Sequence, residues 1–291
     1  MSDNRWSSGK GHRDENFPVA SRLIAPKYRP AILAFYRFAR SADDIADHPT
    51  LEAAEKLRLL DEMEATLFGQ AEMADAVPLR QAISQHRLSA RHPTDLLQAF
   101  RLDVEKSRYA SWDELMDYCS LSAMPVGRLV LDIHRESPGT WAASDALCAA
   151  LQVINHLQDC GKDYRALGRV YLPQDTLAEH GADIADLGKD RASPELLATI
   201  RALTQKADAL LAASEPLPGL IRDRRLRLEI DVIRRLAAVL IARLRQFDPL
   251  SEPVHLSKRA MIGLTIVAVT KGATRWLERP AARRSRVEAR R

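Results

Sequence analysis

The sequence predicts an all-α protein that folds as one helical domain. Only 12 glycines occur in 291 residues, and alternating runs of valine, threonine and tyrosine are few, which argues against sheets. Long stretches rich in alanine, leucine, arginine, glutamate and aspartate favour helices instead. No repeat of solenoid length and no low-complexity linker divides the chain. We therefore expect a disordered N-terminal stub at 1–15, a helical domain at 16–277 and a basic tail at 278–291.

Helix start and stop signals recur along this domain. Short polar side chains cap helix N-termini, proline suits the first turn, and glycine often follows the last one. The expected signals are Pro30 at the start of a helix through 47, Thr94 as the cap of 95–109, Ser111 with Glu114 as a capping box, Ser144 and Gly168 at the two ends of a long helix, Ser193 before another long helix, and a further helix at about 220–247.

The composition is typical of a globular protein outside the membrane, with 46% hydrophobic and 28% charged residues. The polar first fifteen residues do not resemble a secretory signal. The apolar run "AMIGLTIVAV" at 260–269 is about half of the ~20 residues that a spanning helix needs, so we expect a core or interface helix there. Three cysteines without metal-ligand spacing fit reduced thiols. These features predict a cytoplasmic protein.

The formal net charge is +4, and arginine dominates the stretch 279–291. Such a tail is either a solvated, frayed end or a contact for anionic lipid. Basic residues interleaved with aromatic ones, as in nucleic-acid-binding motifs, are missing from the sequence, so we expect no nucleic-acid partner. The sequence predicts no particular oligomeric state.

The stretch "SADDIADHP" at 41–49 crowds three aspartates at the end of a largely apolar helix. Carboxylates one turn apart repel each other and destabilise a helix, so a positive group is expected beside them. Tyr36, Arg40, Asp43 and Asp47 are spaced by four, three and four residues. This spacing places all four side chains on one helical face.

A second polar stripe of the same kind lies in "QVINHLQDCGKD" at 152–163. Gln152, Asn155, Asp159 and Asp163 also share one helical face. A solvated charged face would explain either stripe alone. Two stripes that each end in acids four residues apart favour a shared site.

Carboxylates on two facing helices fit the chemistry of magnesium. Mg²⁺ prefers oxygen ligands and is usually held by one or two carboxylates together with substrate phosphates. We therefore predict two or three Mg²⁺ ions that neutralise a bound diphosphate and make it a leaving group. The predicted metal ligands are Asp43, Asp47, Asn155, Asp159 and Asp163.

Three residues after the second stripe are further candidates. Arg169 and Tyr171 follow it in a loop, and Arg165 lies near the end of the helix. Guanidinium groups bind phosphates well, so Arg165 and Arg169 are expected at the diphosphate, although a surface arginine is an alternative for Arg165. Tyr171 joins the four aspartates as a catalytic candidate.

Other residues near these motifs have simpler interpretations. His156 adjoins Asn155 but is interpreted as a hydrogen-bonded structural residue. The small residues Ser122 and Gly127 either leave room for a chain-like ligand or let two helices approach closely.

Four segments of the chain resemble the trans-isoprenyl diphosphate synthases that join two prenyl chains head to head, which are the squalene, dehydrosqualene and phytoene synthases. They are "ENFPVAS", "FYRFARSADDIAD", "YCSLSAMPVG" and "INHLQDCGKDYRALGRVYLP". The likeness covers residues 15–175, with a looser helical match to 277. The last segment is most similar to the hydroxysqualene synthase branch of bacterial hopanoid biosynthesis.

The resemblance implies the isoprenoid synthase fold, with helices around a central apolar cavity. It also implies that Tyr36, Arg40 and Gln152 line the diphosphate or substrate site, with Asn16 near its entry. It assigns Mg²⁺ to the same four aspartates and Asn155. One position departs from the family pattern. Gln158 stands where phytoene and dehydrosqualene synthases usually carry arginine, and a neutral amide holds diphosphate less strongly than a guanidinium.

The expected reaction is the Mg²⁺-dependent conversion of presqualene diphosphate to hydroxysqualene, in which water captures a carbocation. No glycine-rich dinucleotide motif follows a strand, which fits a product that is not reduced. One alternative is a squalene or presqualene diphosphate synthase that condenses two farnesyl diphosphates. Another is a non-catalytic assembly factor, which the two intact acidic pairs disfavour. Because the ligands are long hydrocarbons, we expect the protein to visit the inner face of the cytoplasmic membrane.

Overall fold

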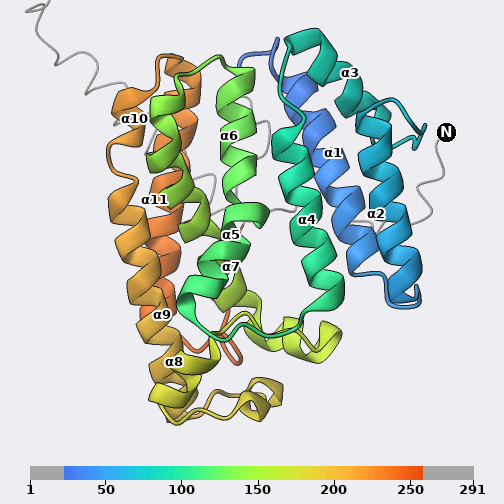
Figure 1. Ribbon diagram of the computed structural model, residues 1–291. Coiled ribbons are helices and arrows are strands. Elements are labelled where there is room, and N and C mark those ends of the chain that lie inside the picture. Colours follow the sequence, from blue (N-terminus) through green and yellow to red (C-terminus); the bar gives the residue numbers. More distant parts are fainter. Residues whose placement is uncertain (1–22, 258–291) are drawn as a thin grey trace, which may run out of the picture.

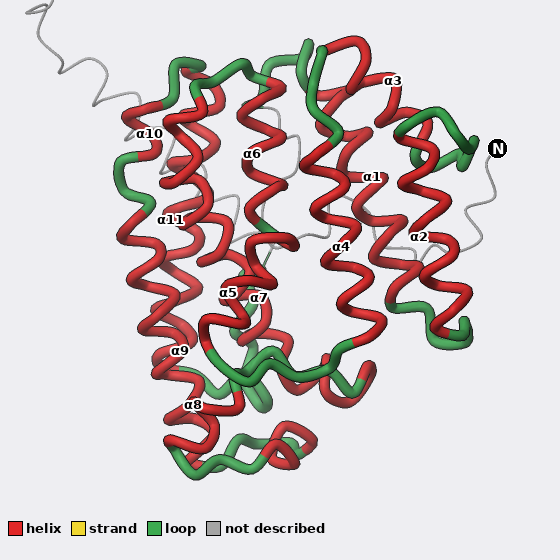
Figure 2. Tube along the Cα trace, viewed as in Figure 1, coloured by secondary structure: helices red, strands yellow, loops and turns green. Residues whose placement is uncertain are grey.

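The computed structural model describes residues 23–257, and all regular structure in that range is α-helical or 3₁₀-helical (Figures 1 and 2). The prediction of an all-α fold is therefore confirmed. The helices are α1 (Arg29–Ala46), α2 (Ala53–Leu67), α3 (Val77–His86), α4 (Arg91–Glu105), α5 (Trp112–Ser122), α6 (Met124–Ile133), η1 (Pro138–Thr140), α7 (Trp141–Leu167), α8 (Gln174–Glu179), η2 (Ile184–Gly188), α9 (Pro194–Ala213), α10 (Leu217–Leu220) and α11 (Arg224–Gln246).

Most of the predicted helix signals are confirmed. Pro30 lies in the first turn of α1. The Ser111 hydroxyl accepts a hydrogen bond from the Glu114 backbone N–H at the start of α5, and Ser193 caps α9 in the same way. Gly168 ends α7 in the left-handed conformation with φ of 63°, which a residue with a Cβ adopts less readily. Local chemistry thus sets these helix ends.

Two predicted caps are wrong because the helices begin earlier. Thr94 lies inside α4, where its hydroxyl donates to the carbonyl of Ala90 at 2.9 Å. This bond satisfies the hydroxyl within the helix, as is common for threonine. Ser144 is buried inside α7, which starts at Trp141 because the 3₁₀ turn η1 leads directly into it.

Helix α7 lies at the centre of the arrangement. It packs against α9 and α11 on one side and against α5 and α6 on the other. Helices α1, α2 and α3 pack on one another and form a second group. Helix α4 packs on α5 and α6 and also contacts α1 and α2, so it joins this group to the helices around α7, as Figure 1 shows. The polar stripes of α1 and α7 therefore belong to two helix groups that α4 connects.

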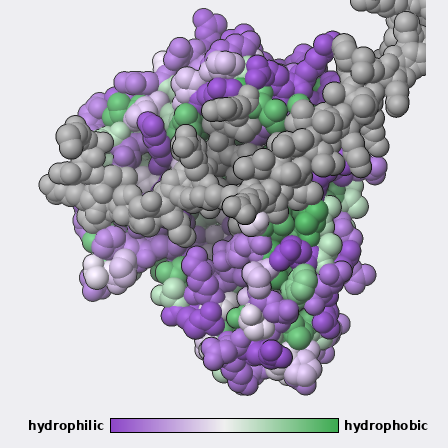
Figure 3. Space-filling model, turned by 180° about the vertical axis from the view of Figure 1, so that it is seen from behind, coloured by the Kyte–Doolittle hydropathy of each residue, from purple (hydrophilic) through white to green (hydrophobic). Residues whose placement is uncertain are grey.

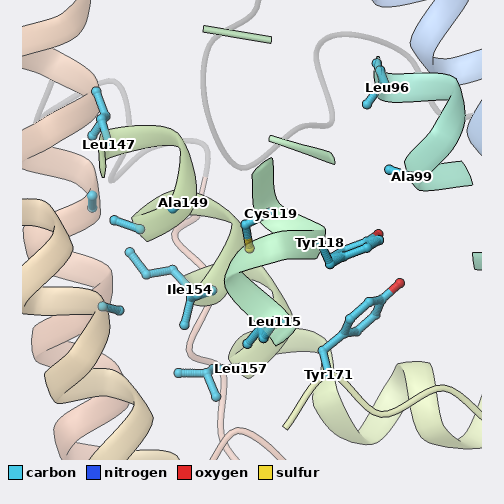
Figure 4. Packing of buried hydrophobic residues seen from close by; sticks show 14 of the residues in the cluster. Leu96, Ala99, Leu115, Tyr118, Cys119, Leu147, Ala149, Ile154, Leu157 and Tyr171 are labelled. Carbon is cyan, nitrogen blue, oxygen red and sulfur yellow. The ribbon is translucent and has the colours of Figure 1, made fainter. Parts of the chain in front are cut away.

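A continuous hydrophobic core runs through this arrangement. Buried side chains of α4, α5 and α7 belong to this core, and Figure 4 shows Leu115 of α5 near Ile154 and Leu157 of α7. Figure 3 shows the molecule from behind, with hydrophilic residues over much of the described surface and small groups of hydrophobic ones between them. Within residues 23–257, the large hydrophobic residues that are exposed are Phe68, Val126, Leu167 and Leu220.

Several sequence predictions concern residues beyond this range. Asn16, the stub at 1–15, the expected helix at 260–269 and the arginine-rich stretch 279–291 lie outside the described residues. Between residues 23 and 257, no helix has the length and apolar character needed to cross a membrane.

Gly127 is needed for the close approach of α6 and α7. A Cβ built on it would lie 2.5 Å from Cys148 Sγ and 2.6 Å from Ser144 Oγ. Of the two interpretations of this glycine, the structure therefore supports helix packing. Ser122, by contrast, lines a cavity, so the small residues of "LSAMPVG" serve different purposes.

We predict that Gly127→Ala lowers the free energy of unfolding by about 1–3 kcal/mol, because it overpacks the contact between α6 and α7. Thermal melts followed by circular dichroism would measure the loss. The double variant Gly127→Ala/Cys148→Ala should regain part of it, and Gly219→Ala, at a site with open space, serves as the control. Equal melting temperatures for Gly127→Ala and wild type would contradict the prediction.

Candidate active site

The two polar stripes line one cavity of about 430 Å³. Its walls come from α1, α4, α5, α6 and α7 and from the loop after α7. The lining residues are Tyr36, Ala39, Arg40, Asp43, Asp47, Leu96, Phe100, Asp103, Tyr118, Ser122, Val126, Gln152, His156, Asp159, Asp163, Leu167, Arg169 and Tyr171. The expected apolar cavity is thus only partly apolar, because carboxylates, arginines and hydroxyls line it together with leucine, phenylalanine and valine.

Two predicted site residues do not line this cavity. Asn155 is half-buried on α7, one turn before Asp159, and is not part of the cavity wall. Arg165 is exposed, and its Nη1 donates to the carbonyls of Leu187 at 3.3 Å and Lys189 at 3.5 Å. These carbonyls at the end of η2 draw the guanidinium away from the cavity.

Arginines supply the positive charge that the crowded aspartates of α1 require. Arg40 Nη1 lies 2.9 Å from Asp43 Oδ2, and its Nη2 lies 2.6 Å from Asp44 Oδ1. Asp47 Oδ1 is 3.0 Å from Nη1 of Arg169. Two of the predicted diphosphate ligands, Arg40 and Arg169, therefore pair with two of the predicted metal ligands, Asp43 and Asp47.

Asp103 of α4 is a site residue that the sequence analysis missed. Its carboxylate accepts hydrogen bonds from the hydroxyls of Tyr118 at 2.8 Å and Tyr171 at 2.9 Å. Arg169 also donates to its backbone carbonyl at 3.0 Å. Burial raises the pKa of Asp103 to about 6, although Arg169 opposes the rise. The sequence did contain an indication of this role, because the spacing of Leu96, Phe100 and Asp103 places them on one helical face.

Aromatic rings form the wall next to Asp103. The rings of His156 and Tyr171 are stacked with centroids 3.6 Å apart and an interplanar angle of 17°. In Figure 4 the hydroxyl groups of Tyr118 and Tyr171 point away from the packed leucines of the core. The wall therefore combines aromatic rings, two of them stacked on each other, with tyrosine hydroxyls that the Asp103 carboxylate holds in place.

His156 differs from its interpretation as a hydrogen-bonded structural residue. It is 7% exposed and lines the cavity, and its Nε2 has no hydrogen-bond partner. Burial, assisted by Arg169, lowers the pKa of His156 to about 3. The imidazole is therefore neutral at neutral pH.

The acids of the site repel one another. Burial and the charge of Asp47 raise the pKa of Asp43 to about 7, against an ordinary value of 3.8. Burial and the charge of Asp159 likewise raise the pKa of Asp163 to about 7. Both shifts indicate that the positive charges of the nearby arginines do not fully offset burial and the negative charges of the neighbouring carboxylates.

This donor set fits a divalent cation that binds together with an anion. Between residues 23 and 257, no three acidic, histidine or cysteine side chains are close enough to hold a metal ion by themselves. Asp47 Oδ1 is nevertheless buried without a hydrogen bond, although it is paired with Arg169. The raised pKa values of Asp43 and Asp163 indicate that the negative charge of the cavity is not fully neutralised. A divalent cation would neutralise it, and Mg²⁺ commonly takes its remaining ligands from phosphate and water.

Comparison with known proteins identifies the family. The sequence pattern of the squalene/phytoene synthases matches residues 11–260. The chain belongs to this family. It is 55% identical over 250 residues to a hydroxysqualene synthase of Rhodopseudomonas palustris, with 86% of each protein covered, and 52% identical over 265 residues to one of Sinorhizobium fredii, with 91% of each covered.

Solved structures of this family share the architecture. The squalene synthase HpnC from Alicyclobacillus acidocaldarius is 32% identical and superposes with a TM-score of 0.70, over 78% of this chain and 86% of that one. A dehydrosqualene synthase complex is 20% identical with a TM-score of 0.77, over 88% and 90% of the chains. The second match shows the fold alone. The prediction of the isoprenoid synthase fold is thus confirmed, and the family acts on prenyl diphosphates.

The raised pKa values predict that the metal-free protein becomes more stable as the pH falls from 8 to 5.5. Asp43, Asp103 and Asp163 bind protons more tightly in the folded state than in the unfolded chain. Their contribution to the free energy of unfolding therefore decreases as pH rises from about 4 to about 7 and is constant above that.

Thermal melts in EDTA across this pH range would measure the effect. The variant Asp43→Asn/Asp163→Asn should show a flatter pH dependence than wild type. Asp208→Asn, which alters an exposed ion pair with Arg245, should keep the wild-type slope. Parallel slopes for all three proteins would contradict the assignment.

Proposed function

We propose that the protein is a Mg²⁺-dependent hydroxysqualene synthase that acts in squalene and hopanoid biosynthesis. The observation that carries this proposal is the pair of acidic stripes on one cavity, in a chain that is 51–55% identical to three proteins named hydroxysqualene synthase. The net reaction converts presqualene diphosphate and water to hydroxysqualene and diphosphate. No reductant is consumed.

The charged wall of the cavity is the proposed diphosphate site. Asp43 and Asp47 on α1 and Asp159 and Asp163 on α7 would hold Mg²⁺. Asn155, one turn before Asp159 and outside the cavity wall, would reach the metal as a neutral oxygen ligand only after a change of side-chain conformation. When bound, two or three Mg²⁺ ions would neutralise the diphosphate and favour its departure. Arg40, Arg169, Tyr36 and Gln152 line the same cavity. The two arginines would exchange part of their carboxylate contacts for phosphate oxygens.

The aromatic and aliphatic residues of the cavity suit a cation. The C–O bond of the substrate breaks with its electron pair on the diphosphate, and the cyclopropylcarbinyl cation rearranges. Tyr118, Tyr171, His156, Leu96 and Phe100 line the cavity. The rings of tyrosine and phenylalanine attract cations.

Neutral polar groups of the cavity are suited to hold the water that ends the reaction. The Ser122 hydroxyl and His156 Nε2 are buried and lack hydrogen-bond partners. A water oxygen forms the new C–O bond to the cation, and its extra proton passes to the released diphosphate. The product is then an uncharged C30 alcohol.

A second candidate is the condensation of two farnesyl diphosphates, since the relative from Alicyclobacillus acidocaldarius is named a squalene synthase. The charged wall serves both reactions, so product analysis decides between them. A non-catalytic assembly role is disfavoured, because both acidic pairs are present and face one cavity.

We predict that Asp43→Asn, Asp47→Asn, Asp159→Asn and Asp163→Asn each lower kcat/KM for presqualene diphosphate on the order of 100-fold or more. Each tenfold loss corresponds to ~1.4 kcal/mol of barrier. Diphosphate release measures the activity, with Asp208→Asn as the control. Full turnover in EDTA would contradict the metal assignment, and near-wild-type rates in the variants would contradict the residue assignment.

We predict that presqualene diphosphate and Mg²⁺ without NADPH yield a C30 alcohol whose oxygen comes from water. Mass spectrometry of the product made in ¹⁸O-water would show the label. Squalene formed only with NADPH, or dehydrosqualene formed by proton loss, would exclude water capture. Efficient consumption of farnesyl diphosphate alone would favour the second candidate.

We further propose a peripheral contact between the arginine-rich stretch 279–291 and anionic lipid, on its charge alone. Deletion of these residues should weaken binding to phosphatidylglycerol vesicles in a sedimentation assay and leave the melting temperature unchanged. Binding that is equal before and after deletion, and insensitive to salt, would refute the contact.

A further inference from the structure

The chain returns to α7 after α11 has ended. This return is firmly held, because Asp248 is 7% exposed and accepts hydrogen bonds from the Ala192 backbone N–H at 3.0 Å and from the Ser251 hydroxyl at 2.7 Å. Val254 is buried, and its carbonyl accepts from Arg243 Nε at 3.2 Å. His255, the next residue, is thus carried by an anchored segment.

The imidazole of His255 bridges two neighbouring residues of the second acidic stripe. Its Nδ1 lies 3.3 Å from Gln158 Nε2, and its Nε2 lies 3.3 Å from Asp159 Oδ1. An amide nitrogen only donates and a carboxylate only accepts. In the neutral ring, Gln158 therefore donates to Nδ1, and Nε2–H donates to Asp159.

Gln158 is the buried end of this hydrogen-bonded bridge. Its side chain is 4% exposed, so it has little freedom to move, while Asp159 is part of the cavity wall. The His255 side chain is 42% exposed, so its removal leaves no large hole in the core. The arrangement constrains a cavity carboxylate at little cost to packing.

We propose that His255 is a positioning residue: with Gln158, it holds the Asp159 carboxylate in the orientation that binds a divalent cation and diphosphate. The inference rests on the proposed metal–diphosphate site, but not on which prenyl diphosphate enters it. Partners that orient metal ligands typically change metal affinity 10- to 100-fold when they are removed.

The test compares His255→Ala, His255→Gln and His180→Ala, a half-buried histidine outside the cavity. Two quantities are measured: the rise in melting temperature caused by Mg²⁺ with inorganic diphosphate, and the Mg²⁺ concentration for half-maximal turnover. His255→Ala should reduce the rise and increase that concentration about tenfold or more, with the metal-free melting temperature unchanged. His255→Gln can still donate to Asp159 and should restore most of both.

Gln158→Leu tests the same bridge from its other end. It removes the donor to Nδ1 of His255 and places an apolar side chain in the buried position. It should change Mg²⁺ dependence in the same direction as His255→Ala, and it replaces that variant if His255→Ala does not fold.

The outcomes separate this inference from the proposed function. Wild-type Mg²⁺ dependence in both His255→Ala and Gln158→Leu, or a lower kcat without a change in Mg²⁺ dependence, would overturn the positioning role. No stabilisation of the wild type by Mg²⁺ and diphosphate would overturn it together with the metal site. Stabilisation that depends on His255, in a protein that does not convert presqualene diphosphate, would support the role and refute only the proposed reaction.

Discussion

The buried guanidinium of Arg169 is the group on which the architecture of the site depends. It is 7% exposed, pairs with Asp47, and donates to Tyr171 Oη at 3.2 Å and to the backbone carbonyl of Asp103. Burial opposes its charge, but Asp103, Tyr171 and Asp47 raise the pKa of Arg169 above its ordinary value. One cation thus connects α1, α4 and the loop after α7, and it offsets part of the repulsion among acids that face one cavity.

The end of α7 brings Arg169 to this position. Gly168 adopts a positive φ, and its backbone N–H donates to the carbonyl of Tyr164 at 3.0 Å, which is the hydrogen-bond pattern of a helix that ends in a left-handed glycine. The Arg169 backbone N–H then donates to the carbonyl of Asp163 at 3.3 Å. The cap therefore joins the last acid of the second stripe to the arginine that neutralises the first stripe. A feature of helix termination is also a feature of the site.

Charged and aromatic residues line the same cavity, and Asp103 contacts both kinds. Its carboxylate holds the hydroxyls of Tyr118 and Tyr171, and its carbonyl holds Arg169. A leaving diphosphate and the cation it leaves behind need opposite surroundings within a short distance. Under the proposed function, Asp103 therefore connects the groups that hold the diphosphate with the aromatic side chains near the cation.

The sequence by itself determined the helical fold, most of the helix ends and the two acidic stripes. These features follow from periodicity, caps and turn residues, which act within a few positions along the chain. The tertiary structure decided which polar residues meet. Asp103, Gln158 and His255 joined the site through contacts between helices or segments far apart in sequence, and Arg165 turned instead to the carbonyls after η2. Local pattern specifies the face of a helix, but only packing specifies what lies opposite that face.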